Sequence, residues 1–254
     1  MAAMNLGLSG RAYVVTGGSR GLGRATAAEL VAEGAAVVVS ARDERAVTDA
    51  VAGLGGDAVG VAADNADPAT PQRLVEAATR RWGRLDGAVV SVGGPAAGRV
   101  TEVSDADWRA GFESVFRGTV RLVRTVAASV GAGGSIVLVL STSARSPIAG
   151  LAVSNGLRPG LAMVAKDLAD ELGPRGVRVN GLLPGRVATD RTVELDALTG
   201  DAEAARAERS ATIPLRRYGE PEEFARVAAF VLSPAASYVT GTMIAVDGGA
   251  LRVP

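Results

Sequence analysis

A glycine-rich segment near the amino terminus has the composition and spacing of a phosphate-binding turn. It runs from Gly17 to Gly23 in a Gly-x-x-x-Gly-x-Gly pattern, after the apolar run 12–16 and before a segment of helical period. Glycines let bare backbone N–H groups approach a pyrophosphate, and the start of the next helix adds its positive dipole end. Because the chain has 33 glycines, such a pattern can arise by chance. Its place between the first strand and the first helix, where a dinucleotide-binding turn must lie, is the stronger indication. The candidate dinucleotide-binding residues are Gly17, Ser19, Arg20, Gly21, Leu22 and Gly23.

The end of the second apolar run, 36–40, bears on which dinucleotide is bound. NAD sites of this type usually carry an acid there, roughly 20 residues after the glycines, that holds the ribose 2′-hydroxyl. This chain has Ser40 and Arg42 instead, and Arg20 of the glycine turn is expected in the same region. Guanidinium groups and a hydroxyl suit a 2′-phosphate, and Asp43 is better placed as the cap of the next helix. We therefore expect NADP, as NADPH, in preference to NAD.

Missing residue types restrict the chemistry further. The chain has no cysteine and no histidine, so we expect no disulfide, thiol nucleophile, Ser-His-Asp triad or metal site. Lys166 is the only lysine. A formal net charge of zero provides no general attraction to nucleic acid or to an anionic membrane. No apolar run is long enough to cross a bilayer, and residues 1–10 lack the pattern of a secretory signal. We expect a cytoplasmic protein with a small-molecule substrate.

The elements that must position these residues alternate along the chain. Mostly apolar runs predict strands at 12–16, 36–40, 58–62, 88–92, 136–141, 177–183 and 243–246. Segments of helical period lie between them, near 21–33, 44–53, 69–82, 105–130, 152–172 and 221–232. This alternation predicts a single α/β domain: a doubly wound, Rossmann-like parallel sheet of about seven strands with helices on both faces. The polar stretch 188–217 has no strand character, and we expect it to fold over the site as a substrate lid.

Further motifs occur in a fixed order along nearly the whole chain. Besides Thr16-Gly17 through Gly23, they are Asp64 after the third strand, the run Pro184 to Thr189, and Gly241 with Val246-Asp247-Gly248-Gly249. With these motifs the chain closely resembles the short-chain dehydrogenase/reductase family. The resemblance implies that Asp64 and Asn65 meet the adenine, and it implies a homo-oligomer, usually a tetramer. It also implies nicotinamide-side contacts from Gly93, Pro184, Gly185, Val187 and Thr189.

The chain departs from the family pattern at the catalytic positions. Ser141, at the tip of the fifth strand, matches the family's catalytic serine. Thirteen residues further on, the family has a tyrosine and then, four residues later, a lysine; this chain has Ser154 and Arg158. Val115 stands where the family has an asparagine, and none of the three tyrosines lies near these positions. The chain resembles a divergent branch of the family with Ser-Asn-x-x-Arg in place of Tyr-x-x-x-Lys.

A serine and an arginine cannot repeat the chemistry of a tyrosine and a lysine. A phenol, with a pKa of about 10, can be tuned to act as a general acid, whereas a serine hydroxyl is a much weaker acid. Arg158 keeps its charge, so it can stabilise an oxyanion but cannot relay a proton. Hydride transfer itself needs only an aligned cofactor and carbonyl.

We therefore expect an NADP-dependent oxidoreductase that acts on a carbonyl/alcohol pair, with Ser141, Ser154 and Arg158 as its catalytic residues. Two alternatives stay open. One is a non-redox nucleotide-binding protein or inactive partner subunit; the other is a non-redox enzyme, such as a dehydratase or cyclase. The apolar residues Val92, Val115 and Leu140 slightly favour a hydrophobic or aromatic substrate over a small sugar.

Overall fold

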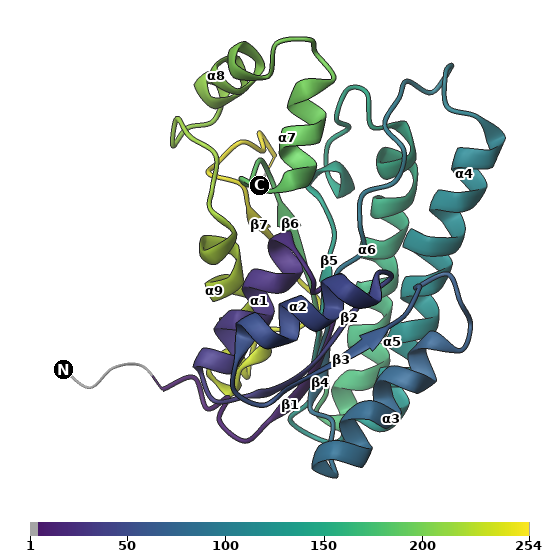
Figure 1. The fold of residues 1–254 in the computed structure, drawn as a ribbon, viewed down its shortest axis with the longest axis vertical. Coiled ribbons are helices and arrows are strands. Elements are labelled where there is room, and N and C mark those ends of the chain that lie inside the picture. The colour runs from purple at the N-terminus through teal and green to yellow at the C-terminus, as the bar shows by residue number, and fades with distance from the viewer. Residues whose placement is uncertain (1–4, 254) are drawn as a thin grey trace.

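The computed structural model describes residues 5–253, which contain one parallel sheet of seven strands (Figure 1). The strands are β1 (Ala12–Thr16), β2 (Ala36–Ala41), β3 (Ala58–Ala62), β4 (Gly87–Val90), β5 (Ser135–Val139), β6 (Arg178–Pro184) and β7 (Met243–Val246). Their order across the sheet is β3-β2-β1-β4-β5-β6-β7, and every neighbouring pair is parallel. The predicted doubly wound sheet is confirmed.

Helices cover both faces of the sheet. They are α1 (Gly21–Ala32), α2 (Glu44–Leu54), α3 (Thr70–Trp82), α4 (Asp105–Gly111), α5 (Gly118–Ser129), α6 (Ala152–Leu172), α7 (Asp190–Ala197), α8 (Ala202–Thr212) and α9 (Pro221–Leu232). One apolar cluster joins the sheet to α3, α5 and α6, and a second joins it to α1 and α9. On β1, Val14 belongs to the first cluster while Tyr13 and Val15 belong to the second. A strand covered on both sides must be apolar throughout, as the sequence pattern indicated.

The chain reverses its direction of winding between β1 and β4. Strands β2 and β3 lie on one side of β1, and β4 to β7 lie on the other. The connections that follow β1 and β4 therefore leave in opposite directions and open a crevice at the carboxyl edge of the sheet. Thr16 and Ser91 join the two strands there: the Thr16 hydroxyl donates to the Ser91 carbonyl at 2.9 Å and accepts from the Ser91 N–H at 3.0 Å.

Two strands end earlier than the apolar runs indicated. β4 ends at Val90 rather than at residue 92, and β5 ends at Val139 rather than at residue 141. Residues just past these strands therefore lie in loops above the crevice, not in the sheet. Ser141 is one of them, and it begins a short 3₁₀ turn, Thr142–Ala144.

The segment predicted as one helix over 105–130 is divided in three. A π-helical turn, Phe112–Arg117, separates α4 from α5 and contains the buried Val115. At its end, a Cβ on Gly118 would lie 2.2 Å from the Asn65 carbonyl oxygen, so α5 begins in direct contact with the loop after β3. The apolar pattern over 105–130 predicted one continuous helix and did not indicate this π turn. Such turns frequently occur at functional sites.

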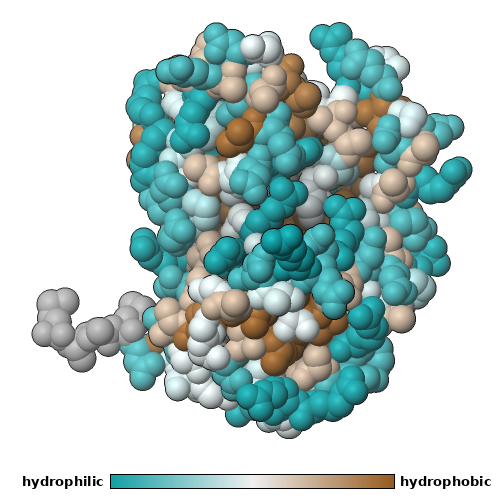
Figure 2. Space-filling model, in the orientation of Figure 1, coloured by the Kyte–Doolittle hydropathy of each residue, from teal (hydrophilic) through white to brown (hydrophobic). Residues whose placement is uncertain are grey.

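The stretch 188–217 forms two helices, α7 and α8, which Figure 1 shows beyond the carboxyl-terminal end of β6. In the space-filling view the upper surface is notched between the α7–α8 side and the α4 side, and apolar residues lie beside the notch (Figure 2). No helix within residues 5–253 combines the length and apolar character needed to cross a membrane.

Candidate active site

Close backbone contacts shape the glycine turn between β1 and α1. Gly17 has a φ of +59°, and a Cβ there would lie 2.6 Å from the Ser91 carbonyl oxygen. A Cβ on Gly23 would lie 2.3 Å from the Gly17 carbonyl oxygen. Both positions therefore require glycine. Within the described chain no side chain caps α1, whose N-cap residue is Arg20, so its first N–H groups are available to a phosphate. Ser19 and Leu22 lie half-buried in the same turn.

The loop that follows β6 meets this turn. The Gly185 N–H donates to the Val246 carbonyl at 3.0 Å, which fixes the loop to β7. Thr189 is the N-cap residue of α7, and its methyl carbon lies 3.5 Å from the position that a Cβ on Gly21 would take. The hydroxyls of Thr189 and Thr192 both donate to the Val187 carbonyl, at 3.4 and 2.6 Å. The predicted nicotinamide-side residues Pro184, Gly185, Val187 and Thr189 thus lie on a loop that reaches the start of α1.

Ser40 and Arg42 lie where the ribose of the cofactor is expected. Ser40 is buried at the end of β2, and its carbonyl accepts the Gly18 N–H at 3.0 Å, which joins β2 to the glycine turn. Arg42 is exposed just beyond the strand. Asp43 caps α2 by accepting the Ala46 N–H at 2.7 Å, as predicted. The end of β2 therefore presents a hydroxyl and a guanidinium group, with its nearest carboxylate already engaged.

The sequence suggested that Arg20 lies in the same region as Arg42, whereas its side chain points toward α7. Its Nη1 lies 3.5 Å from Asp190 Oδ2 and 3.7 Å from Glu194 Oε1, both on α7. The structure therefore connects Arg20 with α7. A part for Arg20 in binding a 2′-phosphate stays a prediction, which requires the side chain to exchange two carboxylates for the phosphate.

Asp64 and Asn65 lie past β3, in the turn that leads to α3. Asp64 Oδ1 accepts the Ala66 N–H at 2.9 Å, and the Asp64 carbonyl accepts the Thr70 hydroxyl at 2.6 Å. Gly93 follows β4 on the next loop, and a Cβ there would meet no described atom within 4 Å. The turn after β3 is thus held by its own hydrogen bonds, whereas the space beside Gly93 is open.

Two buried serines face each other at the carboxyl edge of β5. Ser143 Oγ lies 3.0 Å from Ser154 Oγ, and both residues are buried. Ser141, the predicted catalytic serine, uses its hydroxyl to accept the Ser143 N–H at 3.1 Å. The sequence did not identify Ser143 as a partner of Ser154. The Ser-Thr-Ser run could have indicated it, but only the 3₁₀ turn explains why its third residue meets α6.

Arg158 lies one turn along α6 from Ser154, on the same face of the helix. It is only 5% exposed, and within residues 5–253 no carboxylate forms an ion pair with it. Its Nη1 donates to the Val139 carbonyl at 2.8 Å and its Nη2 lies 3.5 Å from the Val92 carbonyl. The Nε–H has no partner in the described chain. Burial lowers the pKa of Arg158 to about 10, so the side chain remains a cation at neutral pH.

The start of α6 is positioned by Asn155 and by close helix packing. The Asn155 amide accepts the Ile148 N–H at 2.9 Å and donates to the Ile148 carbonyl at 2.9 Å. This pair of bonds holds the loop that carries Ser143 against the helix. Pro159 within α6 has no N–H, so the Asn155 carbonyl lacks its usual helical partner. A Cβ on Gly156 would lie 2.8 Å from the Trp108 ring, so α4 contacts this same turn.

The three tyrosines and the single lysine lie elsewhere, as the sequence predicted. Tyr13 is buried within β1, and burial raises its pKa to about 12. Tyr218 donates to the Asp196 carboxylate at 3.1 Å, and Tyr238 is fully exposed. Lys166 pairs with Asp170 further along α6. None of these four side chains is bonded to the buried serines or to Arg158.

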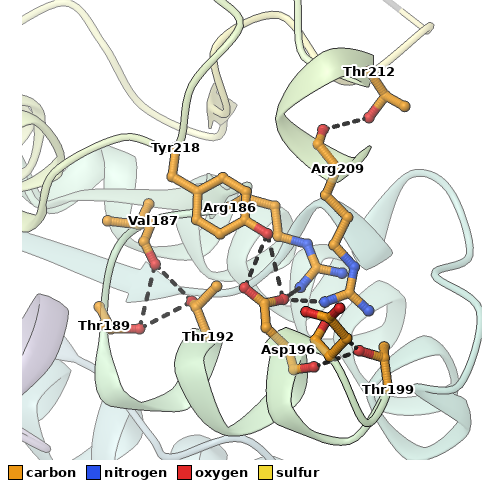
Figure 3. Close-up of polar contacts among 10 residues, drawn as sticks. Arg186, Val187, Thr189, Thr192, Asp196, Thr199, Arg209, Thr212 and Tyr218 are labelled. Atoms are coloured by element: carbon orange, nitrogen blue, oxygen red, sulfur yellow. Dashed lines mark hydrogen bonds and ion pairs between the residues drawn. The ribbon is translucent and has the colours of Figure 1, made fainter. Parts of the chain in front are cut away.

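A buried carboxylate joins α7 and α8 to neighbouring segments (Figure 3). Asp196 of α7 is 3% exposed and accepts from Tyr218, which precedes α9, while Arg209 of α8 also pairs with it. Arg186, from the loop after β6, lies 3.4 Å from the same carboxylate. Burial, followed by the bond to Asp196, raises the pKa of Tyr218. Because these residues come from four separate segments, the cluster fixes α7 and α8 relative to β6 and α9.

Comparisons with known proteins agree with this architecture. The family model for enoyl-(acyl carrier protein) reductases matches residues 17–250. The chain is 35% identical, over 246 residues, to an uncharacterized oxidoreductase of Methylorubrum extorquens, with 95% of this chain and 98% of that one covered. It is 33% identical over 250 residues to dehydrogenase/reductase SDR family member 4 of Homo sapiens, covering 95% and 88%. The crystal structure of L-sorbose reductase from Gluconobacter frateurii, complexed with NADPH and L-sorbose, matches with a TM-score of 0.93 and 30% identity, covering 99% and 100%.

A doubly wound sheet with a glycine turn at its crevice, and full-length relatives of this kind, define a short-chain oxidoreductase. The chain belongs to the short-chain dehydrogenase/reductase family. The family resemblance inferred from the motifs is thereby confirmed.

Proposed function

We propose that the chain is an NADPH-dependent oxidoreductase that reduces a carbonyl-bearing small molecule without a tyrosine as general acid. The observation that carries this proposal is Arg158, a buried cation that pairs with no carboxylate among residues 5–253 and lies one helical turn from the buried Ser143–Ser154 pair. A charge in such a position costs stability unless a bound ligand makes use of it. Arg158 lies at the carboxyl edge of the sheet, where proteins of this fold bind their ligands.

The residues at the crevice fit a dinucleotide. The uncapped start of α1 and the tight glycine turn suit the pyrophosphate, and Asp64 and Asn65 are available to the adenine. The open space beside Gly93 and the loop Pro184 to Thr189 suit the nicotinamide. When bound, the cofactor supplies a hydride.

The phosphorylated form of the cofactor is favoured at the end of β2. Ser40 and Arg42 stand where an NAD site usually has an acid, and Asp43 is engaged in capping α2. No carboxylate in the described part of the chain pairs with Arg42. The related L-sorbose reductase of Gluconobacter frateurii is described in complex with NADPH.

The chain's own residues orient the substrate and hold charge. In the Ser143–Ser154 pair one hydroxyl donates to the other, so a further hydroxyl proton remains for the substrate oxygen. Arg158 supplies fixed positive charge in a poorly solvated place, where it stabilises a developing oxyanion strongly. The Ser141 hydroxyl supports the Ser143 backbone. The proton comes from water or from the substrate.

We further propose that 188–217 is a lid over the substrate. Support comes from its contacts with the crevice walls. Arg191 of α7 donates to the Pro95 carbonyl at 2.9 Å, and its Nε lies 2.9 Å from the position of a Cβ on Gly94. Arg20 of the glycine turn pairs with Asp190 and Glu194 on the same helix.

Cofactor titrations and a turnover panel test this proposal. Arg42→Ala should weaken NADPH binding about tenfold or more and leave NADH binding unchanged, because only NADPH carries the 2′-phosphate. Arg45→Ala is the matched control, since Arg45 is an exposed arginine three residues further on that pairs with Asp49. NADPH oxidation is then followed with ketones, quinones and acyl thioesters. Tight NADPH binding without turnover of any of them would contradict a reductase and favour a nucleotide-binding protein.

A further inference from the structure

Arg20 lies between the glycine turn and the first turn of α7. Its Nη1 is 3.5 Å from Asp190 Oδ2 and 3.7 Å from Glu194 Oε1. Both distances exceed the roughly 2.7–2.9 Å of a charge-assisted hydrogen bond, and all three side chains are more than half exposed. Exposed ion pairs of this kind are weak, because water and salt screen the charges. A stronger anion can therefore take Arg20 from α7.

The same arginine can also reach the end of β2. The Gly18 N–H donates to the Ser40 carbonyl at 3.0 Å, and a Cβ on Gly18 would lie 2.8 Å from a side-chain carbon of Val39. The glycine turn is thus packed on the end of that strand. Arg20 follows Gly18 by two residues, a chain length of at most about 7 Å. A swing of its long, exposed side chain can bring the guanidinium group to the 2′-phosphate proposed at Ser40 and Arg42.

Two kinds of anion therefore compete for one guanidinium group. Resting on the proposed function, we propose that Asp190 and Glu194 are cofactor-specificity residues. They hold Arg20 until the 2′-phosphate of NADPH takes it, so that NADPH, and not NADH, releases the first turn of α7 from the glycine turn. A phosphate monoester carries close to two negative charges and three acceptor oxygens, which a guanidinium group can bind bidentately. The ribose hydroxyl of NADH is uncharged and cannot displace two carboxylates.

The first turn of α7 keeps its other contacts when Arg20 leaves. Arg191 Nη1 lies 3.5 Å from Glu194 Oε2, and its Nη2 donates to the Pro95 carbonyl at 2.9 Å. Glu194 therefore retains a cation, and α7 stays attached to the loop after β4. Asp190 is the first residue of α7, at the positive end of the helix dipole, which stabilises a carboxylate. The exchange thus loosens α7 at one wall of the crevice and leaves it joined to the other.

The competition affects the two cofactors differently. With NADH, Arg20 continues to neutralise Asp190 and Glu194. With NADPH, these ion pairs are lost, and their loss subtracts from the gain that the 2′-phosphate brings. Removing the two carboxylates should therefore strengthen the binding of NADPH and change the binding of NADH little.

A cycle of binding measurements tests this competition. The affinities for NADPH and NADH are measured for the wild-type protein, Asp190→Asn/Glu194→Gln, Arg20→Met and the triple variant. We expect the two carboxylate changes to strengthen NADPH binding about three- to fivefold relative to NADH binding. No such selective gain should occur in the Arg20→Met background. Glu203→Gln with Glu208→Gln, at exposed residues of α8, removes the same charge and is the matched control.

The outcomes distinguish the inference from the proposed function. An equal gain for both cofactors, or the same selective gain in the Arg20→Met background, would overturn the inference, since a general loss of negative charge would explain it. An NADPH preference that Arg20→Met leaves unchanged would also overturn the inference, while the proposed cofactor would stand. A wild-type protein that binds NADPH no more tightly than NADH would overturn both.

A spin label on α7 measures the release directly. The chain has no cysteine, so Val193→Cys, at a side chain that is 56% exposed on α7, provides a single attachment point. We expect saturating NADPH to increase the mobility of the label and saturating NADH to leave its spectrum unchanged. With Asp190→Asn/Glu194→Gln the label should be mobile before cofactor is added. A spectrum that responds equally to the two cofactors, or to neither, would contradict the release of α7 by the 2′-phosphate.

Discussion

At the scale of single residues, Arg158 has the clearest conflict between stability and function. It is buried, it has no carboxylate partner in the described chain, and one of its N–H groups has no acceptor. An interior that only had to be stable would place an apolar side chain there. The neighbouring residues of α6 that pack inward, such as Val153, Leu157 and Leu161, are indeed apolar.

We expect Arg158→Met to raise stability while it removes activity. Loss of the buried charge should stabilise the fold by about 1 kcal/mol, or roughly 2–4 °C in Tm for a chain of this length. Thermal unfolding and steady-state turnover measure the two effects. Leu161→Ala, in the same helix and fully buried, is the contrasting control and should cost about 2–5 kcal/mol. A fall in Tm for Arg158→Met as large as that of the control would show that Arg158 is structural.

The pH dependence of turnover should lack the titration of a general acid. Because Ser143 and Ser154 do not ionise in the usual range, kcat should stay nearly constant from about pH 6 to 9. Burial lowers the pKa of Arg158 to about 10, so its charge is lost, and kcat should fall, as the pH rises through that value. The unfolded chain binds more protons than the folded chain between that value and the ordinary arginine pKa. The free-energy cost of burying the charge of Arg158 is therefore relieved as the pH rises above about 10. A bell-shaped profile centred near neutral pH would contradict the assignment.

At the scale of elements, the apolar runs predicted where strands and helices lie, because both faces of this sheet are buried. The same runs predicted β4 and β5 to be longer than they are, because the apolar residues Val92 and Leu140 follow the last residues of these strands. The π turn around Val115 and the 3₁₀ turn that brings Ser143 to Ser154 depend on hydrogen bonds that leave no periodic signal. Local propensity therefore predicted the positions of elements but not the contact between the two buried serines.

The proposed lid formed by α7 and α8 can be tested by loosening its attachment. Asp196 is the shared acceptor for Tyr218, Arg186 and Arg209, so Asp196→Asn removes the charge that holds α7 and α8 in place. We expect hydrogen exchange to accelerate at least tenfold in α7 and α8 and KM to rise, with the sheet unaffected. Glu203→Gln on α8 is the control, since Glu203 is exposed. Equal protection of α7 and α8 in Asp196→Asn and Glu203→Gln would show that the cluster does not hold the lid.

At the scale of the whole molecule, several large apolar side chains are exposed on the surface. Phe112 is 44% exposed and stacks on Phe116, with ring centroids 5.4 Å apart, and Met163, three residues after Gly160 on α6, is 67% exposed. Phe116 in turn contacts Gly160 of α6. Large exposed apolar residues that cluster in this way are typical of a subunit interface. They support the homo-oligomer that the family resemblance implied.

We expect light scattering to give a dimer or tetramer of the 25.6 kDa chain. Phe112→Glu combined with Met163→Glu should shift the protein to a smaller species, because charged groups at an interface core are costly. Leu198→Glu serves as the control, since Leu198 is 72% exposed at the end of α7, away from this surface. A monomeric wild-type protein would contradict the prediction, and so would an unchanged mass in the double variant.

The proposed reaction depends on where the nicotinamide lies. A crystal structure of the protein with NADP⁺ or NADPH measures this directly. We predict a pyrophosphate at the start of α1, a 2′-phosphate on Ser40 and Arg42, and a nicotinamide ring against the Ser143–Ser154 pair within reach of Arg158. A nicotinamide ring bound away from these three side chains, or an empty glycine turn at saturating cofactor, would contradict the account.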